Sequence, residues 1–193
     1  MKFNIEEANN LLQNRRSIFP KNYSGERVDD KIINQMLENA NWAPTHKMTE
    51  PWRFVVFADE GIKTFADFQA DFYKENIGEH YQEMQEKKLR EKPLLCSHII
   101  AIFMKRNPIV PEIEEISSVA AAVQNMHLTA TANGVGCYWT TGGVTYMKGI
   151  NAEFGMDSSN RLMGFLNVGM PKEGDWPKGK RKSIDEKVNW IRD

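Results

Sequence analysis

The stretch EIEEISSVAAAVQNMHLTATANGVGCYWTTGG, residues 112–143, decides the fold more than any other part of the chain. Its apolar residues recur at helical spacing, so residues 112–133 are predicted to form a long helix. Asn133-Gly134 supplies the C-terminal stop of that helix. The aromatic and β-branched residues that follow predict a strand over residues 135–140. A long helix is therefore expected to lead directly into a strand.

Shorter elements are predicted on both sides of this pair. Asn4, followed by Glu7 three positions later, is typical of a helix start, and that helix is expected to run up to Arg15. Further helical patterns cover residues 29–40, 62–90 and 147–154, and strands are predicted at residues 53–57, 94–104 and 162–168. The strongly polar segment 62–90 is expected at the periphery, and the continuous apolar run 94–104 is predicted to be a central strand.

The mixture of helices and strands lacks the regular alternation of a doubly wound sheet and predicts an α+β fold. No G-x-G-x-x-G follows a strand, which argues against a Rossmann nucleotide site. With 193 residues, of which 41% are hydrophobic, the chain is expected to form a single domain over residues 1–193.

Charge and hydropathy favour small-molecule partners or another protein chain. The formal net charge is -1, so no basic field for nucleic acid or a membrane surface is expected. Acidic residues stand near the N-terminus where a secretory signal would be apolar. The longest apolar run, Ile99–Met104, is far below the roughly 20 residues that span a bilayer. A cytoplasmic protein is therefore expected.

The cysteines and histidines do not suggest a metal centre. Cys96 and Cys137 lack C-x-x-C spacing and lie in apolar surroundings, so both are expected to be buried free thiols. The four histidines show no pairing with one another or with carboxylates at a metal-ligand spacing, and no metal site is expected.

Two segments in the first third of the chain carry groups that bind ligands. Arg15-Arg16-Ser17 offers guanidinium groups and a hydroxyl, the donors that a phosphate monoester needs. Basic residues at a helix end also simply complement the helix dipole. Residues 42–47 and 51–54 combine tryptophans with hydroxyl, imidazole and ammonium groups that could line a cleft for a flat ring. The plainer alternative is a loop whose tryptophans belong to the core.

Two segments in the second half offer similar alternatives. The glycines of residues 134–143 permit the backbone to approach a flat ligand, but paired glycines also end helices and turn chains. The basic run at residues 178–182 could complete an anion site, dock an acidic partner or nucleic acid, or form a solvated face.

Taken in order, these segments resemble the nitroreductase family of flavoproteins over nearly the whole chain. The family tends to show R-R-S after its first helix, then A-P-S-x-x-N-x-Q-P-W-x-F, G-x-G-x-x-W, G-F-x-x-x-G-x-P and a basic segment running into E-x-V-x-W. The counterparts here are Arg15-Arg16-Ser17, Ala43 through Phe54, Gly134 through Trp139, Gly164-Phe165 through Gly169 and Pro171, and Arg181-Lys182 through Val188 and Trp190.

The resemblance implies an FMN cofactor whose phosphate is held by Arg15 and Ser17, helped by Arg16 and joined by Arg181. Lys180 or Lys182 is the alternative to Arg181, because the C-terminal register is loose by a residue or two.

Residues that flank the flavin ring follow from the same resemblance. Those expected against the flavin from the partner subunit are Trp42, Pro44, Thr45 and His46, and the histidine is typical of the small branch of the family. Those expected to flank the ring or its ribityl chain are Trp139, Thr140 and Thr141, while residues 129–134 are a weaker candidate for nicotinamide contact. Met48 and Glu50 stand where many members have Asn and Gln, so one polar contact to the flavin is expected to differ.

The implied protein is a nitroreductase-like homodimer with a mainly antiparallel sheet and residues 170–193 as a C-terminal extension exchanged between subunits. The apolar residues of that extension, from Ile184 to Ile191, need a surface on which to pack. The implied function is the ping-pong transfer of reducing equivalents from NADH or NADPH to a nitroaromatic, a quinone or a similar acceptor. No catalytic side chain is expected, because the flavin performs the chemistry. The alternatives are a non-catalytic binding module that uses residues 178–182, and a flavin enzyme that performs dehalogenation or flavin breakdown.

Overall fold

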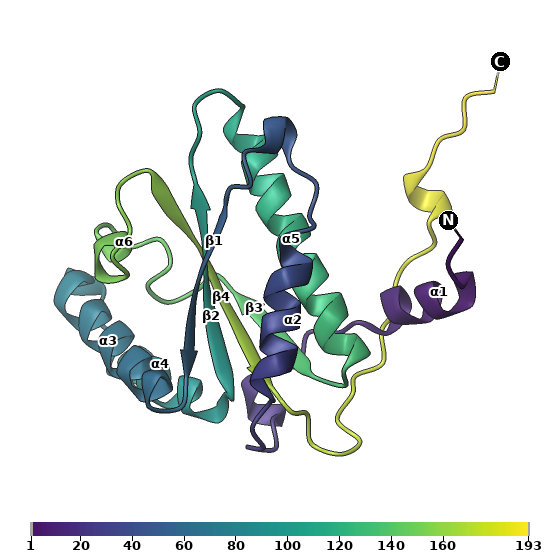
Figure 1. Ribbon diagram of the computed structural model, residues 1–193. Coiled ribbons are helices and arrows are strands. Elements are labelled where there is room, and N and C mark those ends of the chain that lie inside the picture. The colour runs from purple at the N-terminus through teal and green to yellow at the C-terminus, as the bar shows by residue number, and fades with distance from the viewer. Residues whose placement is uncertain (1, 193) are drawn as a thin grey trace.

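The computed structural model describes residues 2–192 and has three layers, a sheet between two layers of helices (Figure 1). The four strands are β1 (Trp52–Ala58), β2 (His98–Lys105), β3 (Gly136–Thr140) and β4 (Asn160–Gly169). They lie in the order β1-β2-β4-β3, and every neighbouring pair is antiparallel. The predicted antiparallel α+β architecture is confirmed. Strand β3 is an edge strand, which matters for the site.

The helices divide between the two faces of the sheet. Helices α2 (Asp30–Ala40) and α5 (Glu112–Ala132) cover one face, and α3 (Glu60–Asn76), α4 (Glu83–Glu91) and α6 (Ile150–Glu153) lie on the other (Figure 1). Helix α1 (Ile5–Asn14) and the last residues of the chain both extend away from this body. Short 3-10 turns, η1 to η5, occupy Pro20–Asn22, His46–Met48, Gly78–His80, Lys92–Leu95 and Asp185–Lys187.

Strand β2 is buried on both faces and carries the core. Ile100, Ile102 and Met104 pack in the cluster between the sheet and helices α2 and α5. Their neighbours Ile99, Ala101 and Phe103 pack in the cluster under α3, as expected for side chains that alternate across a sheet. The strand begins at His98 and not at residue 94 as predicted, because Pro93 lies in the 3-10 turn η4 that precedes it.

The expectation that residues 62–90 are peripheral is wrong for α3. Its side chains Ile62, Phe65 and Phe72 are at most 8% exposed and form much of the second core cluster. Helix α4 has no buried residue and does lie at the surface. Charges on the outer face of α3 mask its buried aromatic stripe, so polarity alone was a poor guide to its position.

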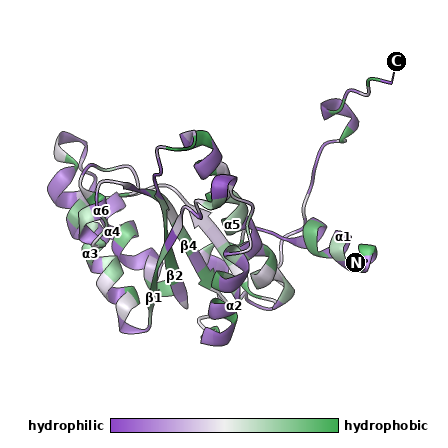
Figure 2. Ribbon diagram, turned by 45° about the horizontal axis from the view of Figure 1, so that its top comes forward, coloured by the Kyte–Doolittle hydropathy of each residue, from purple (hydrophilic) through white to green (hydrophobic). Residues whose placement is uncertain are grey.

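Helix α1 and the C-terminal segment extend outside the body and include hydrophobic residues (Figure 2). Phe3, just before α1, is 82% exposed, and Trp190 and Ile191 in the C-terminal segment are 73% and 85% exposed. A cap formed by Asn4, whose side chain accepts from the backbone N–H of Glu6 and Glu7, starts α1, but no residue of the helix is buried. No helix within residues 2–192 is long and apolar enough to cross a membrane.

A bulge in β4 lies beside the last residue of β3. The β2–β4 register shifts between Ile102 and Phe103, opposite Gly164, whose φ is 118°. A Cβ at Gly164 would lie 2.3 Å from the carbonyl oxygen of Thr140. Glycine therefore lets the last residue of β3 pack directly on β4.

Two other glycines allow a tyrosine ring to pack closely against the sheet. Cβ atoms placed on Gly136 and Gly169 would lie 3.1 Å and 2.4 Å from the ring of Tyr23. The Tyr23 hydroxyl donates to the carbonyl oxygen of Asn167 at 3.0 Å, so this ring fastens the chain after α1 to the sheet. Gly134, with φ 69°, ends α5 as the sequence predicts.

Gly164→Ala should lower the free energy of unfolding by about 3 kcal/mol, because the new Cβ meets backbone and the φ value is strained. Gly155→Ala is the matched control, with φ 66° and no atom within 4 Å of the added Cβ, and should cost about 1 kcal/mol. Urea unfolding monitored by circular dichroism measures both. Equal losses at the two positions would contradict the role given to the bulge.

Candidate functional site

The segment after α1 lies along the edge strand β3. The backbone N–H of Ile18 donates to the carbonyl oxygen of Cys137 at 2.9 Å, and Ser17 forms an isolated parallel bridge with Cys137. This pairing fixes Arg15, Arg16 and Ser17 where α1, β3 and the C-terminal half of α5 meet. The predicted phosphate-binding segment is therefore rigidly attached to the sheet.

The C-terminal segment passes the same place. The indole N–H of Trp176 donates to the carbonyl oxygen of Asn14 at 2.8 Å, at the end of α1. The guanidinium of Arg16 lies against Gly179, where a Cβ would be 1.9 Å from Nη2. Arg181 lies close enough to Arg15 for its positive charge to lower the pKa of the Arg15 guanidinium. Arg15, Arg16 and Arg181, predicted together from distant parts of the sequence, are thus brought together within one chain.

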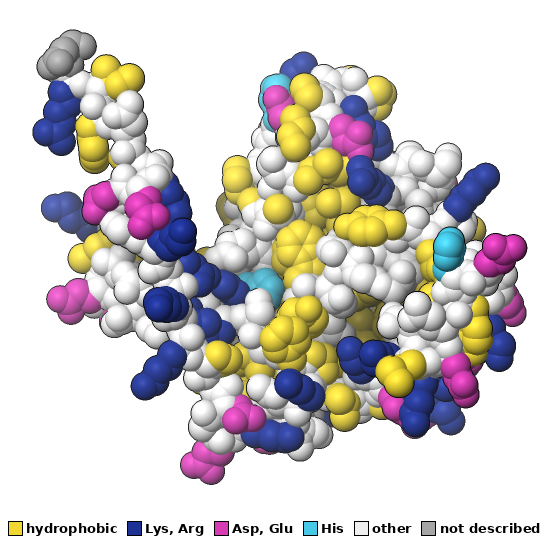
Figure 3. Space-filling view, turned by 180° about the vertical axis from the view of Figure 1, so that it is seen from behind, with side chains coloured by type: hydrophobic (Ala, Val, Ile, Leu, Met, Phe, Trp, Pro, Cys, Tyr) yellow, Lys and Arg dark blue, Asp and Glu magenta, His cyan; other side chains and the backbone are white. Residues whose placement is uncertain are grey.

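This arginine cluster lacks a counter-charge. None of its three guanidinium groups forms an ion pair with a carboxylate within residues 2–192. Burial, and then the charges of Arg16 and Arg181, hold the pKa of Arg15 below its usual value. The Nε of Arg16 is buried without a hydrogen-bond partner. Figure 3 shows Lys and Arg side chains gathered where the C-terminal segment leaves the body. An anion with several oxygens fits this donor set.

His127 adds a neutral donor beside the cluster. It lies on α5, its side chain is only 6% exposed, and its Nδ1 has no hydrogen-bond partner. Burial, and secondarily the charge of Arg15, lowers its pKa to about 4. Sequence analysis did not single it out, because one histidine on an apolar helix face gives no signal by spacing.

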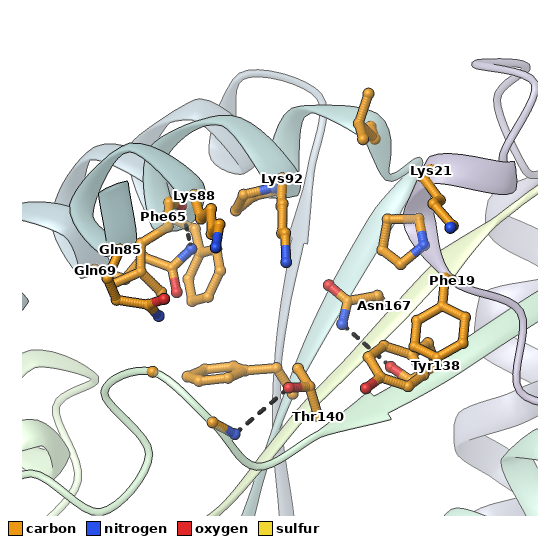
Figure 4. A pocket seen from close by; sticks show the side chains of 17 residues that line it. Phe19, Lys21, Phe65, Gln69, Gln85, Lys88, Lys92, Tyr138, Thr140 and Asn167 are labelled. Atoms are coloured by element: carbon orange, nitrogen blue, oxygen red, sulfur yellow. Dashed lines mark hydrogen bonds between the residues drawn. The ribbon is translucent and has the colours of Figure 1, made fainter. Parts of the chain in front are cut away.

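A cavity of about 320 Å³ opens on the other side of β3, between the sheet and helices α3 and α4 (Figure 4). Tyr138 and Thr140 line it because they alternate along β3 with Cys137 and Trp139. The ring of Phe19 packs on Tyr138 with centroids 4.4 Å apart. Phe19 is two residues after Ser17, so the chain along the edge of β3 connects this cavity to the arginine cluster.

Every charged residue that lines the cavity is a lysine. Figure 4 shows Lys88 and Lys92 directed from α4 and the following turn toward the space in front of β3, with Lys21 on the far side. The apolar part of the lining includes Phe65, Leu89, Pro93 and Phe165. Such a cavity suits a flat, partly apolar ligand that carries or gains negative charge. Sequence analysis missed these lysines because helical spacing does not place them beside β3.

The residues predicted to flank the flavin ring point to opposite faces of the sheet or lie in the turn after β3. Thr140 lines the cavity, and its Oγ1 accepts from the N–H of Gly142 at 3.4 Å. Thr141 is exposed at the start of the following turn. Trp139 points the other way, packs against the core under α2 and α5, and donates from Nε1 to the carbonyl oxygen of Met163 at 3.1 Å. The indole of Trp139 therefore packs on the core side of β3, and its contact with the flavin stays a prediction.

Pro44, Thr45 and His46 lie at the N-terminal end of α5, near residues 113–118. His46 contacts the carboxylate of Glu114 through Nδ1, and a shallow cavity lies between residues 44–46 and residues 113–118. Trp42 lies apart from them and lines a shallow cavity with Leu11 of α1 and residues 125–132 of α5. Trp42 is 78% exposed. Its indole is not core, contrary to the plainer alternative, whereas Trp52 is 5% exposed and is core.

The backbone of the loop after His46 is strained. Lys47, Met48 and Glu50 have φ values of 50°, 52° and 42°, a region that residues with a Cβ rarely adopt. The Thr45 hydroxyl accepts from the N–H of Glu50 at 3.1 Å and holds the turn closed. Strain of this kind collects at ligand-binding segments. Two of the strained residues, Met48 and Glu50, are also those at which the sequence departs from the family pattern.

Residues 44–46 and the arginine cluster do not meet within one chain. His46 contacts α5 in its first turn, and the cluster lies near His127, which is roughly 20 Å farther along the helix at 1.5 Å per residue. One chain therefore presents two separate parts of the predicted site.

Both cysteines are free, as expected. Burial raises the pKa of Cys96 to about 12 and raises that of Cys137 as well, so both are thiols at neutral pH. Within residues 2–192, no group of three or more His, Cys, Asp and Glu side chains could hold a metal ion.

Comparisons with known proteins agree with the motif order. YdjA of Escherichia coli strain K12, named provisionally as an NAD(P)H nitroreductase, is 30% identical over 86% of this chain and 89% of its own length. Human iodotyrosine deiodinase 1 is 29% identical over 94% of this chain and 67% of its own length.

Solved structures share the fold over the full chain. A nitroreductase-like protein from Bacillus cereus superposes with a TM-score of 0.82 at 27% identity, covering 100% of this chain and 98% of that one. The FMN-dependent nitroreductase NfnB of Mycobacterium smegmatis, crystallised with NADPH, gives a TM-score of 0.76 at 16% identity and covers 97% and 99%. The sequence model described as the Nitroreductase family matches residues 12–170. The chain belongs to the nitroreductase family.

Proposed function

We propose that the protein is an FMN-dependent oxidoreductase that passes reducing equivalents from NADH or NADPH to an electrophilic acceptor such as a nitroaromatic or a quinone. The observation that carries the proposal is the arginine cluster, which holds positive charge without a carboxylate at the edge of β3. A phosphate monoester supplies the missing charge and oxygens. FMN-dependent NfnB shares the fold, and this supports the same cofactor here.

The residues present fit FMN along the edge of β3. Arg15, Arg16 and Arg181 would hold its phosphate, with the Ser17 hydroxyl as a further donor. The ring would lie toward the lysine-lined cavity, beside Thr140 and the turn that Thr141 begins. No Rossmann dinucleotide fingerprint is present in the sequence, which favours a mononucleotide over FAD.

FMN, when bound, supplies hydride acceptance from the nicotinamide and hydride donation to the acceptor. The chain's own residues bind it, orient it and set the charge around it. Lys88 and Lys92 lie in a cavity without an acidic lining residue, so their ammonium groups favour negative charge on a bound ring.

A homodimer would join the two separate parts of the site. Residues 44–46 lie far from the arginine cluster of their own chain, and apolar side chains on α1 and residues 184–191 are exposed. A second copy that covers these side chains would bring its residues 44–46 to the first copy's cluster. Residues 170–193 serve in this proposal as the extension exchanged between subunits.

The alternative of a binding module that uses residues 178–182 is less favoured. Gly179 and Arg181 lie at the arginine cluster, so this run is engaged with residues 15–16 and is not a free basic arm. The similarity to iodotyrosine deiodinase 1 keeps reductive dehalogenation as an alternative for the acceptor chemistry. Product analysis with halogenated and nitro-substituted phenols distinguishes the two.

The purified protein should be yellow, and heat or acid should release FMN. Because one site serves two substrates in turn, double-reciprocal plots at several nicotinamide concentrations should be parallel when the acceptor is varied. Chromatography of the released flavin and steady-state kinetics measure these properties. A colourless protein that cannot be reconstituted with FMN would refute the cofactor, and intersecting lines would refute the ping-pong order.

Arg15→Ala should weaken FMN binding by about 2 kcal/mol or more, because it removes a charge-assisted contact to the phosphate. The dimer should remain intact. Arg27→Ala is the control, because Arg27 pairs with Asp30 and Asp59 away from the site and should leave FMN affinity unchanged. Fluorescence titration of flavin-free protein measures both, and equal affinities for the two variants would exclude Arg15 from the phosphate site.

Truncation after Pro177 removes Arg181 and the exposed apolar residues of the tail together. The shortened protein should be monomeric or aggregated and should bind no flavin. Sedimentation recorded at protein and flavin wavelengths measures both properties. A folded, fully yellow monomer would show that the flavin site is complete within one chain.

A further inference from the structure

A buried imidazole faces the arginine cluster and is not used by the proposed function. His127 is 6% exposed, and it lies close enough to Arg15 for the charge of that guanidinium to lower the imidazole pKa. Its Nδ1 is sealed from solvent without a hydrogen-bond partner. A buried polar nitrogen without a partner costs free energy unless a ligand or another function compensates for it.

The one charged group that acts on His127 is positive. Arg15 at the end of α1 is the charged group whose field reaches the imidazole, and Arg16 and Arg181 lie beside Arg15. The neighbouring Cys137 of β3 is a neutral thiol. The acidic residues of α5, Glu112, Glu114 and Glu115, are in its first turn, at the other end of the helix. Within the described residues, no carboxylate stabilises a protonated His127.

We infer that His127 belongs to the anion site and takes up a proton when a phosphate dianion binds beside Arg15. This inference rests on the proposed function, because the dianion is assigned to FMN. FMN binding is then coupled to the protonation of a residue in the longest helix.

The coupling follows from the negative charge that the anion adds beside the imidazole. Without an anion, burial and the positive charge of Arg15 both favour the neutral imidazole. A dianion offsets much of the positive charge of the arginine cluster and so favours the imidazolium more than the free site does, and the imidazolium N–H groups also donate to phosphate oxygens. Because the bound form then holds the proton more tightly than the free form, His127 should strengthen binding more at pH 6 than at pH 8.

Phosphate has its own ionisation near pH 6, which weakens binding of the dianion in acid. A matched variant removes this effect from the comparison. His127→Asn keeps a neutral donor but cannot take up a proton. His80→Asn makes the same change at an exposed histidine on the far layer of helices and is the control.

The test uses the full-length protein stripped of flavin. Calorimetric titration with FMN at pH 6.5, in two buffers of different ionisation enthalpy, counts the protons taken up. The wild type and His80→Asn should take up more protons per FMN than His127→Asn. At pH 6, His127→Asn should bind FMN about 10-fold more weakly than the wild type, and the difference should shrink at pH 8. Riboflavin, which lacks the phosphate, should bind all three proteins equally.

Nitrogen-15 NMR of the His127 ring gives a second readout without a substitution. The ring should be neutral in the free wild type at pH 6.5 and protonated in its FMN complex. A ring that stays neutral in that complex, or a proton count that is the same in His127→Asn, would overturn the inference. Titration with inorganic phosphate distinguishes a failure of this inference from a failure of the proposed function. His127-dependent proton uptake with phosphate in a protein that binds no FMN would overturn the cofactor and support the anion site.

Discussion

Arg15, Arg16 and Arg181 repel one another at the point where α1, β3 and the C-terminal segment meet, and the described part of the chain gives them no carboxylate. The cluster is held by backbone contacts: Arg16 donates to the carbonyl oxygens of Gln13 and Arg15, and Trp176 donates to that of Asn14. An anion that binds there converts repulsion into attraction. Because it binds only the folded arrangement, it also stabilises that arrangement. A bound anion would therefore add to the contacts that hold α1 and the tail, neither of which contributes to the core.

The sheet determines the position of the arginine cluster. Strand β2 is buried on both faces and fixes β4 beside it, and the bulge at Gly164 lets the end of β3 pack against β4. With Ser17 paired to Cys137, the same edge strand positions the arginine cluster, and its Tyr138 and Thr140 line the cavity. A packing requirement inside the sheet therefore controls the geometry of the proposed cofactor site. The two helical layers leave this edge uncovered within one chain.

Sequence analysis predicted the antiparallel α+β fold and α5 well, because long periodic segments with a glycine stop have few alternatives. It also predicted that Arg15, Arg16 and Arg181 would be neighbours, but only through the order of the motifs. It misjudged α3, since charges on the outer face hid a buried aromatic stripe. The direction of Trp139 depends on strand register, and the roles of Gly136 and Gly169 depend on where Tyr23 packs. His127 and the cavity lysines could not be predicted, because tertiary contacts alone make them part of a site.

The central claim is that each flavin site is built from the arginine cluster of one subunit and the loop of residues 42–46 of the other. Mixed dimers test it most directly. One subunit carries Arg15→Glu and the other carries Pro44→Asp with His46→Glu, and different affinity tags allow the mixed dimer to be purified. Neither parent homodimer should retain FMN. The mixed dimer should bind about one FMN, because one of its two sites receives an intact cluster and an intact loop. A mixed dimer without flavin, under conditions in which the wild-type dimer is yellow, would contradict the account.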